Sequence, residues 1–440
     1  MKKYSKIVAS LIIIFLCIII LCTALGKTNN KKDANTLCIF APTWIYEKFK
    51  LGEAVDHFME ENPGIHVTIE QNNNQDSSYY PLMNKSLLNK YDIVIGGSRE
   101  HIVLLAASGA IVNFDNGFFD ENLRKEDFFP SFLELGNING NQYMIPLMGE
   151  VISLIIREDL FAEAGLVDQE GRPIPPRDWE ELYSYAGKLT GQNENGEKIY
   201  GLNIDFGNNM LLYNFYACLQ SKRGNIFDNN SNFIDYSSDD VKYVMDMWQR
   251  LVKNGFTPTY TFEDNDAGRT NFKNGTVAMS LTPHSRWVEI SEVLGEDKVG
   301  ILPLPQAEGN GSLTYIHGIT VPIDSPNKEL AFQFIKTELL SKDFQQWTME
   351  KYGKIPSLVR NYETDLSPEW NSIFSWVRNA TTLPIYKDWL KIDKTLQLEL
   401  QKCIMGDQTS EQTIEKIKNQ LDGIRDKQIL LKPAHVIRKN

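Results

Sequence analysis

The order of strand and helix patterns near the start of the chain constrains the fold more than any other feature. Buried or half-buried strands are predicted at residues 36–41, 65–70 and 91–97, and amphipathic helical patterns separate and follow them. Strands that alternate with helices form a parallel sheet whose faces the helices cover. This part of the chain is therefore predicted to be an α/β layer.

The rest of the chain continues the same theme with more helix. Residues 239–254 give the clearest amphipathic helix, and the chain from residue 328 onward is predicted to be mostly helical. A chain of 440 residues exceeds what a single hydrophobic core normally holds, so we expect two lobes. Further strands are predicted at residues 151–156, 277–281, 299–306 and 314–322.

A single long apolar run, Ile7–Leu25, follows three lysines near the N-terminus. A cationic head before an apolar segment is typical of an export signal, and the run is also long enough to cross a bilayer, which takes about 20 residues. Residues 1–26 are therefore predicted to be a signal peptide or membrane anchor, and residues 27–35 a linker. The remaining chain is expected at the extracellular face of the membrane or secreted.

Three outcomes stay open for this N-terminal segment. Ala24-Leu25-Gly26 suits a signal peptidase that reads small residues at alternate positions and would release the protein. Cys22 is a candidate for lipid attachment, although bulky Leu21 stands where a lipoprotein signal usually has a small residue. Alternatively, the uncleaved run is itself the anchor. In each case the N-terminal segment is the only predicted contact with the membrane.

The charge balance and the cysteines exclude several classes of partner and cofactor. A formal net charge of −12 argues against binding to nucleic acid and against direct docking on anionic lipid. Beyond the apolar run, Cys38, Cys218 and Cys403 lack any spacing that would suggest a metal site. They are expected to be small buried side chains, although one disulfide stays open in an oxidising location. We expect no cofactor.

Motifs for catalysis are missing from the sequence. It contains no Gly-x-Ser-x-Gly, no Gly-x-x-x-x-Gly-Lys-[Ser/Thr] and no His-Glu-x-x-His, and its 6 histidines are scattered. Glycoside hydrolysis needs two carboxylates that flank a bond, and 57 acidic residues form many chance pairs. We therefore expect no catalytic residues, and the chain is predicted not to be an enzyme.

Several motifs occur in an order and spacing that resemble one family. They are Tyr-Asp-Ile-Val-Ile-Gly-Gly (91–97), Phe-Lys-Asn-Gly-Thr-Val-Ala-Met-Ser-Leu (272–281), Val-Gly-Ile-Leu-Pro-Leu-Pro (299–305), His-Gly-Ile-Thr-Val-Pro (317–322) and Gly-Lys-Ile-Pro (353–356). Together they resemble the extracellular solute-binding proteins of ABC sugar importers, of the maltose-binding type. The resemblance implies a two-lobed fold of the periplasmic-binding-protein type II class, with a ligand cleft between α/β lobes joined by hinge strands.

Mapped onto these motifs, the resemblance implies how the chain divides. The strands that join the lobes would fall near Leu147–Glu150 and Thr314–Gly318. Gly149 and Gly318 suit hinges there because glycine adopts unusual backbone angles at little cost, although ordinary turns or strand ends explain either one equally well. Lobe one would hold residues 36–147 plus about 317–360, and lobe two residues 148–316 plus about 361–430.

The first group of candidate ligand contacts lies in lobe one and at the first crossing. A sugar presents apolar ring faces edged with hydroxyls, so its site needs aromatic platforms and planar polar groups. Trp44, Ser98 and Arg99 follow predicted strand ends, where open α/β sheets place ligands. Glu150 lies at the first crossing, where the resembled family often has a ligand-contacting acid.

The second group lies in lobe two and at the second crossing. Trp287 matches an aromatic residue that members of the resembled family often stack on the sugar. Asn209 and Tyr213 occupy a loop and helix start where lobe two commonly adds contacts, and His317 and Trp389 complete the set. For Trp44 and Arg99 the alternative is surface packing or a salt bridge. For Asn209, Tyr213, His317 and Trp389 it is packing in the core.

The resemblance implies a monomeric capture protein. It would bind a carbohydrate, expected to be an oligosaccharide, and deliver it to the transmembrane permease subunits of an ABC importer. Transport energy would come from the partner ATPase, since nothing in the chain resembles a nucleotide site. One alternative is a ligand sensor that presents its bound form to a membrane receptor kinase. Another is a secreted carbohydrate-active enzyme, which would turn over an oligosaccharide.

Overall fold

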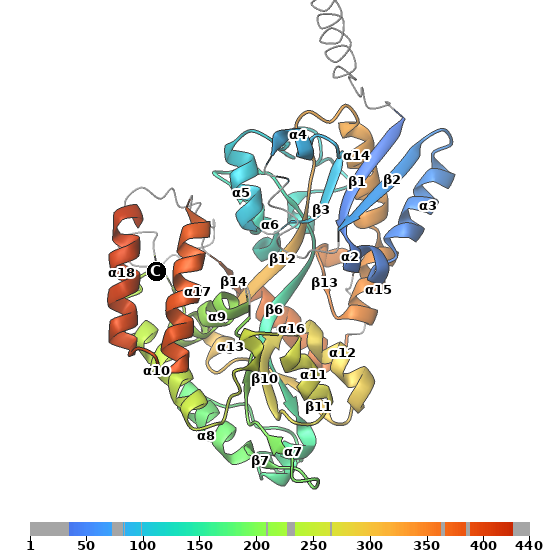
Figure 1. Cartoon of the computed structure of the whole chain (residues 1–440). Helices are drawn as coiled ribbons and strands as arrows, with labels where there is room; N and C mark the ends of the chain where they lie inside the picture. The colour runs from blue at the N-terminus through green and yellow to red at the C-terminus, as the bar shows by residue number, and fades with distance from the viewer. Residues whose placement is uncertain are drawn as a thin grey trace, which may run out of the picture.

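The protein has two lobes that share one large mixed sheet (Figure 1). A computed structural model describes residues 35–72, 82, 84–97, 99–207, 210–226, 234–264, 266–361, 366–383 and 388–425. The main path through the sheet runs in the order β2 (His66–Asn72), β1 (Thr36–Pro42), β3 (Ile93–Gly97), β12 (Leu313–Thr320), β6 (Ile145–Arg157), β10 (Met279–Pro283) and β9 (Asn203–Ile204).

In lobe one, the three strands predicted from the sequence are confirmed. β1 pairs with β2 and with β3, and both pairings are parallel. Alternate residues point to opposite faces of a strand, so the layer has two cores. Ile39 and Ile93 pack with α3 (Leu51–Glu61) and α14 (Lys328–Phe334). On the other face, Phe40 and Val94 pack with residues of α5 (Arg99–Ala107) and α6 (Pro130–Leu135).

Lobe two combines antiparallel pairs with one parallel pair, β9 with β10, and is richer in helix. Strand β6 pairs there with β10 and with β11 (Val299–Leu302). The predicted amphipathic helix is present as α10 (Asp239–Lys253), and its Trp248 is fully buried in the core of this lobe. The same core takes in buried residues of α8 (Trp179–Leu189), α9 (Met210–Arg223), α17 (Trp389–Met405) and α18 (Ser410–Arg425).

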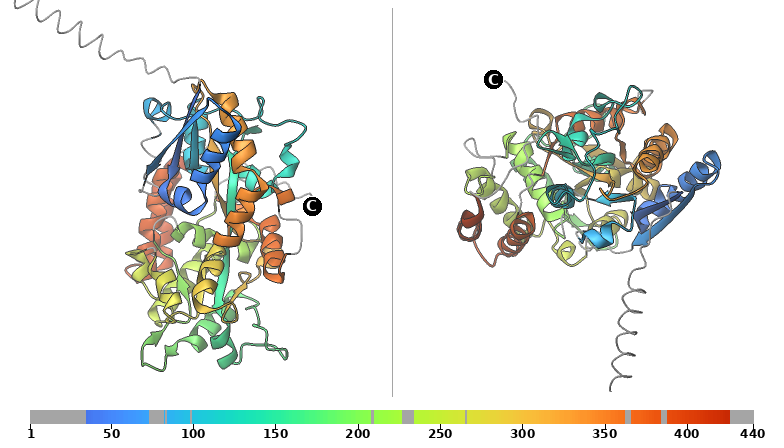
Figure 2. Two further views of the ribbon diagram at one scale, coloured as in Figure 1. Left: turned by 90° about the vertical axis from the view of Figure 1, so that its right-hand side faces the viewer. Right: turned by 90° about the horizontal axis from the view of Figure 1, so that it is seen from above.

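Strand β6 runs from one lobe into the other, and the lobes lie one above the other in both upright views (Figures 1 and 2). It is antiparallel to β12 in the segment where the two lobes meet, with Glu150 opposite Tyr315 and Met148 opposite His317. The two segments expected to cross between the lobes are therefore direct neighbours. A short strand, β13 (Ile355–Pro356), flanks β6 at Met148 and Gly149.

Both glycines at this crossing lie in tightly packed strand positions. Neither Gly149 nor Gly318 has a positive φ, which fits the alternative of an ordinary strand position for each. A Cβ atom at Gly149 would lie 2.1 Å from the ring of Phe132, and one at Gly318 would lie 2.1 Å from Sδ of Met144. Glycine therefore allows another side chain to approach the backbone closely.

The cysteines and the membrane segment were also predicted from the sequence. In the part of the chain that the structure describes, Cys38, Cys218 and Cys403 are free thiols, and the latter two are buried. The N-terminal apolar run, with Cys22, lies outside the described residues. Among the helices that are described, none has the length and apolar character needed to span a bilayer.

Candidate functional site

The region where β6 crosses β12 has two different faces. On one face, Gly149, Val151 and Ile316 lie against an aromatic and aliphatic cluster that includes Phe132 of α6. Helix α16 (Pro368–Asn379) closes this side, and the ring of its Phe374 stacks on Phe129 with 5.8 Å between centroids. Because side chains alternate along a strand, Glu150, Tyr315 and His317 lie on the opposite face, which we call the junction face.

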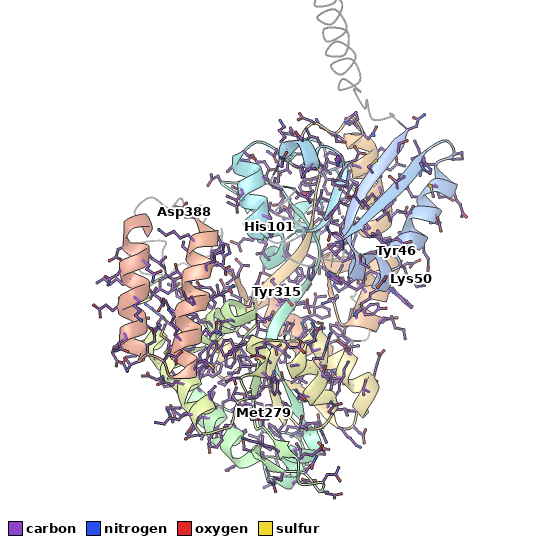
Figure 3. All side chains as sticks on the ribbon, in the orientation of Figure 1. Tyr46, Lys50, His101, Met279, Tyr315 and Asp388 are labelled. Carbon is purple, nitrogen blue, oxygen red and sulfur yellow. The ribbon has the colours of Figure 1, made fainter. Side chains whose placement is uncertain are left out.

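A row of aromatic rings crosses between the lobes on the junction face. Trp44 of α2 (Thr43–Lys48) lies 4.8 Å from His317, measured between ring centroids. The ring of His317 is 6.0 Å from that of Tyr315, and Tyr315 is 4.8 Å from Tyr213 of α9. All four side chains are half-buried, and Figure 3 labels Tyr315 between the lobes. This aromatic row connects the core of lobe one, next to Trp44, with the core of lobe two, next to Tyr213.

A buried charge cluster borders the aromatic row. The Glu150 carboxylate lies 2.7 Å from the ammonium of Lys354 and 3.7 Å from Nε2 of His317. Ser285 donates its hydroxyl to the same carboxylate and accepts a 3.3 Å hydrogen bond from Lys354. The exposed fractions of the Glu150 and Lys354 side chains are 3% and 12%. Each of these groups lies beside the row, so a ligand on the rings would meet polar atoms at its edge.

The pKa values of this cluster follow from burial and from the opposite charges. Burial acts to raise the pKa of Glu150, but the Lys354 ammonium, helped by His317, outweighs it and holds that pKa well below its ordinary value. Burial lowers the pKa of Lys354, and Glu150 offsets part of the decrease. Burial, together with the Glu150 charge, raises the pKa of Tyr315 well above its ordinary value. The shifts therefore favour an ionised carboxyl group at Glu150 and a neutral phenol at Tyr315, and the 2.7 Å ion pair holds the Lys354 amine beside the carboxylate.

Lobe two adds a second set of polar groups. Arg286, at the start of α12 (Ser285–Leu294), pairs with Glu289 at 3.2 Å, and Glu150 and Asp205 also act on its charge. Asp205 follows β9 and accepts hydrogen bonds from Asn203 at 2.9 Å and from Thr282 at 3.0 Å. Burial raises the pKa of the Asp205 carboxyl. Guanidinium and carboxyl groups thus lie near the lobe-two end of the row.

The family follows from a comparison of the chain with known proteins. The family model of bacterial extracellular solute-binding proteins matches residues 47–345. The chain is a bacterial extracellular solute-binding protein.

Solved structures share the two-lobed fold of this solute-binding protein. The GacH receptor of Streptomyces glaucescens, solved unliganded and with acarbose, is 17% identical with a TM-score of 0.73, covering 89% of this chain and 98% of that one. Maltose-bound MalE3 of T. maritima is 18% identical with a TM-score of 0.74, covering 88% and 99%. A solute-binding protein of Thermotoga lettingae bound with α-D-tagatose is 20% identical with a TM-score of 0.76, covering 89% and 99%.

The structure brings four of the predicted ligand contacts together and places Trp287 and Trp389 elsewhere. Trp44, Glu150, Tyr213 and His317 lie on or beside the aromatic row. Trp287 instead packs on Trp370 at 6.2 Å, and its indole N–H donates to the carbonyl oxygen of Val299 at 3.1 Å. Trp389 is 5% exposed and lies in the lobe-two core. Outside the described part of the structure are Ser98, Asn209 and the side chain of Arg99.

Sequence reasoning missed several polar groups that the solute-binding protein gathers at this site. Lys354 occurs inside one of the motifs that carried the family resemblance, Tyr315 lies two residues before another, and Ser285 and Arg286 directly precede the predicted contact Trp287. The signal for Lys354 is Gly353, which ends α15 (Lys342–Tyr352) with a left-handed φ of 63° and turns the next residue toward the junction. A glycine that stops a helix directly before a lysine is therefore the local pattern that points to this residue.

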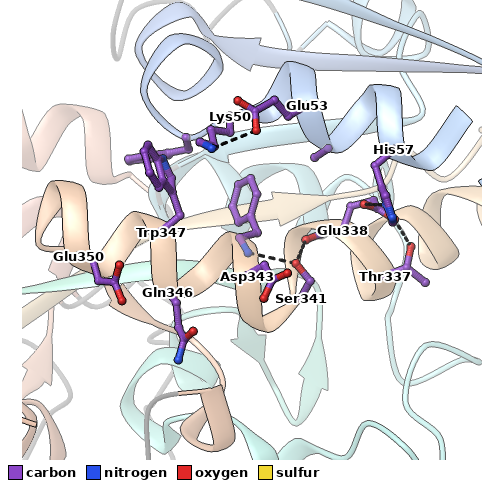
Figure 4. A pocket seen from close by; sticks show the side chains of 13 residues that line it. Lys50, Glu53, His57, Thr337, Glu338, Ser341, Asp343, Gln346, Trp347 and Glu350 are labelled. Carbon is purple, nitrogen blue, oxygen red and sulfur yellow. Dashed lines mark hydrogen bonds and ion pairs between the residues drawn. The ribbon is translucent and has the colours of Figure 1, made fainter. Parts of the chain in front are cut away.

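A hollow lies on lobe one, between α3 and α15, with a volume of about 550 Å³ (Figure 4). Its charged groups are largely paired with each other, as in Lys50 with Glu53 at 3.1 Å and His57 with Glu338 at 2.9 Å. Phe49 lines this hollow and also lies 5.3 Å from Trp44, so it separates the hollow from the aromatic row. The junction face, which combines stacked rings with buried polar groups, is the better candidate for the ligand site.

Proposed function

We propose that this solute-binding protein captures a carbohydrate between its lobes and delivers it to the transmembrane subunits of an ABC importer. The observation that carries the proposal is the aromatic row from Trp44 to Tyr213, with Glu150 and Lys354 at its edge. Aromatic rings accommodate the apolar faces of a sugar, and charged or amide groups bind its hydroxyls. The acarbose, maltose and tagatose bound by proteins of the same fold support this ligand class.

The span of the row supports a ligand of more than one sugar ring. Trp44 belongs to lobe one and Tyr213 to lobe two, and the rings between them lie on the crossing strand. A ligand that contacts both ends binds better when the lobes are closed, and only such a difference in affinity drives closure. The closed form is then the species that a permease would recognise.

The state of Glu150 favours capture over hydrolysis. A glycoside hydrolase needs a protonated acid to assist the leaving group and a second carboxylate across the bond. Lys354 and His317 hold the pKa of Glu150 well below its ordinary value despite burial, so this carboxyl group is not available as a general acid. The proposal therefore predicts that bound saccharide is recovered unchanged.

The N-terminal segment fits retention of the protein near its permease. A freely released receptor would diffuse away from a cell that lacks an outer membrane, so we propose anchoring through Cys22 or through the apolar run Ile7–Leu25 itself. Membrane fractions of cells that express the wild type and a Cys22→Ala variant separate these cases. Loss of retention in the variant indicates a lipid anchor, and release of both proteins would refute anchoring.

A thermal-shift panel on residues 28–440 tests the ligand class. The panel holds mono- and oligosaccharides, amino acids, peptides and polyamines, and hits are followed by calorimetry. We expect a saccharide to raise the melting temperature, because a ligand that binds only the folded state stabilises it. A shift with a peptide or polyamine and with no saccharide would sink the proposal. Chromatography of a recovered hit checks that the sugar is intact.

A further inference from the structure

Side chains of the protein already use most of the hydrogen-bond acceptor positions of the Glu150 carboxylate. One oxygen accepts from Ser285, and the other faces the ammonium of Lys354 at 2.7 Å and Nε2 of His317 at 3.7 Å. Only 3% of the side chain is exposed. A carboxylate offers about four acceptor positions, and the partners in place use most of them. Glu150 therefore has little surface and little hydrogen-bonding capacity left for a ligand.

Lys354, in contrast, keeps hydrogen-bonding capacity for a ligand. An ammonium has three N–H donors, and Glu150 and Ser285 account for two of them. Its side chain is 12% exposed, and Nζ lies 5.8 Å from the ring centroid of Trp44, at the lobe-one end of the aromatic row. One donor of this partly exposed group is thus left beside the ring on which a ligand would stack.

The backbone fixes Lys354 at the meeting point of the two lobes. A Cβ atom at Gly353 would lie 2.9 Å from Cα of Ser285, so the end of α15 in lobe one directly abuts the start of α12 in lobe two. The next strand, β13, then pairs with β6 at Gly149 and Met148. Lys354 therefore extends from lobe one to a carboxylate on the crossing strand and to a hydroxyl of lobe two.

We propose that Lys354 is the charged group that contacts the ligand, and that Glu150 is a positioning residue that holds Lys354 in place. This assignment rests on the proposed function, because it needs a ligand on the aromatic row. The free N–H of Lys354 requires an acceptor oxygen on the ligand. Since Glu150 already neutralises the ammonium at 2.7 Å, a hydroxyl or ring oxygen of an uncharged saccharide fits better than a carboxylate, which Glu150 would repel.

A double-mutant cycle on ligand affinity tests the division of roles. With the saccharide that the panel identifies, Lys354→Met lowers affinity about 10-fold or more, the scale of a hydrogen bond to a charged group. Glu150→Gln lowers affinity by a similar factor in the wild type, because it releases Lys354, but has little further effect in the Lys354→Met background. If Glu150→Gln costs the same factor in both backgrounds, Glu150 contacts the ligand directly and the proposal is overturned.

A matched control uses a second buried carboxylate. Glu399 also has a side chain that is 3% exposed and pairs with a lysine, Lys402, at 3.2 Å, but it lies on α17 among lobe-two helices. Glu399→Gln removes an equivalent charge and leaves saccharide affinity unchanged. If Glu150→Gln proves too unstable to assay, Glu150→Asp keeps the charge and withdraws it from Lys354, and the same cycle applies. An equal loss of affinity from Glu399→Gln would reduce the Glu150 effect to general destabilisation and would overturn the assignment.

A second readout needs no ligand and keeps the proposal separate from the proposed function. In protein labelled with carbon-13 at lysine Cε, the Lys354 signal is the one absent from Lys354→Met. We expect it to titrate at lower pH in Glu150→Gln than in the wild type, because the carboxylate that favours the ammonium is gone. An unchanged titration would show that Glu150 does not hold Lys354. Failure of every saccharide to bind the wild type refutes the proposed function without affecting this titration.

Discussion

Gly149 lies on the crossing strand, and the substitution Gly149→Ala tests why a glycine is needed there. The new Cβ atom would lie 2.1, 2.5 and 2.6 Å from three ring atoms of Phe132, all closer than real Cβ contacts come. Phe132 is fully buried, so its ring cannot swing into solvent. Overpacking of this kind costs about 1–3 kcal/mol, and we expect a loss of unfolding free energy in that range.

The partner substitution Phe132→Leu shows whether the ring causes the loss. A smaller side chain leaves a cavity, which by itself costs on the order of 1–2 kcal/mol, but it also makes room for the new methyl group. The double variant is therefore expected to be no less stable than Phe132→Leu alone, which gives a coupling energy of about 1–3 kcal/mol. Gly191→Ala is the matched control, because a Cβ atom there meets nothing within 4 Å.

Urea unfolding measures these free energies. The transition is followed by far-UV circular dichroism and by tryptophan fluorescence, and coincident curves establish that a two-state treatment holds. We expect Gly191→Ala to stay within about 0.5 kcal/mol of the wild type. If Gly149→Ala is as stable as that control, or if Phe132→Leu does not relieve its cost, close approach of the ring is not the reason for the glycine.

Three further predictions concern pH and the aromatic residues. Burial lowers the pKa of His284 from 6.5 to about 4. The unfolded chain therefore binds a proton at His284 more tightly than the folded chain does. About 3 kcal/mol of unfolding free energy is lost as pH falls from 6.5 to 4. Urea midpoints measured against pH for the wild type and His284→Asn test this loss, and parallel profiles for the two proteins would contradict it. Trp44→Ala and Tyr213→Ala each lower saccharide affinity about 5- to 10-fold in calorimetry, whereas Trp347→Ala, in the hollow between α3 and α15, leaves it unchanged. Trp287→Ala lowers stability by about 3 kcal/mol with little change in affinity, and a large loss of affinity at unchanged stability would instead support its predicted ligand contact.

The parts of the fold that were predicted from the sequence are those with a local residue pattern. Strands β1, β2 and β3 and helix α10 each have a periodicity that neighbouring residues alone produce, and each is present. The gathering of Glu150, Tyr315 and His317 on one face also follows from alternation along paired strands. Trp44 joins them because it follows β1 at the edge where α/β sheets place ligands.

The predicted residues that lie away from the junction face, and the polar groups that sequence reasoning missed, depend on contacts between distant segments. Trp287 was the predicted contact in this segment, but the start of α12 directs Ser285 and Arg286 toward the charge cluster, while Trp287 packs on Trp370 of α16. No local pattern distinguishes these neighbours, because the direction of a helix is set by what it packs against. The pairing of Lys354 with Glu150 likewise joins residues that are far apart in the chain.

By itself, the sequence determined the α/β layers, the two-lobed family and the crossing segments, because strand and helix periodicities and ordered motifs are written in consecutive residues. Only the tertiary structure decided which side chains share the junction face, and that Gly149 makes room for Phe132. It also decided that Glu150 is enclosed by Lys354 and Ser285. Burial and charge pairing belong to no single segment, since both arise when β6, α12 and the end of α15 come together.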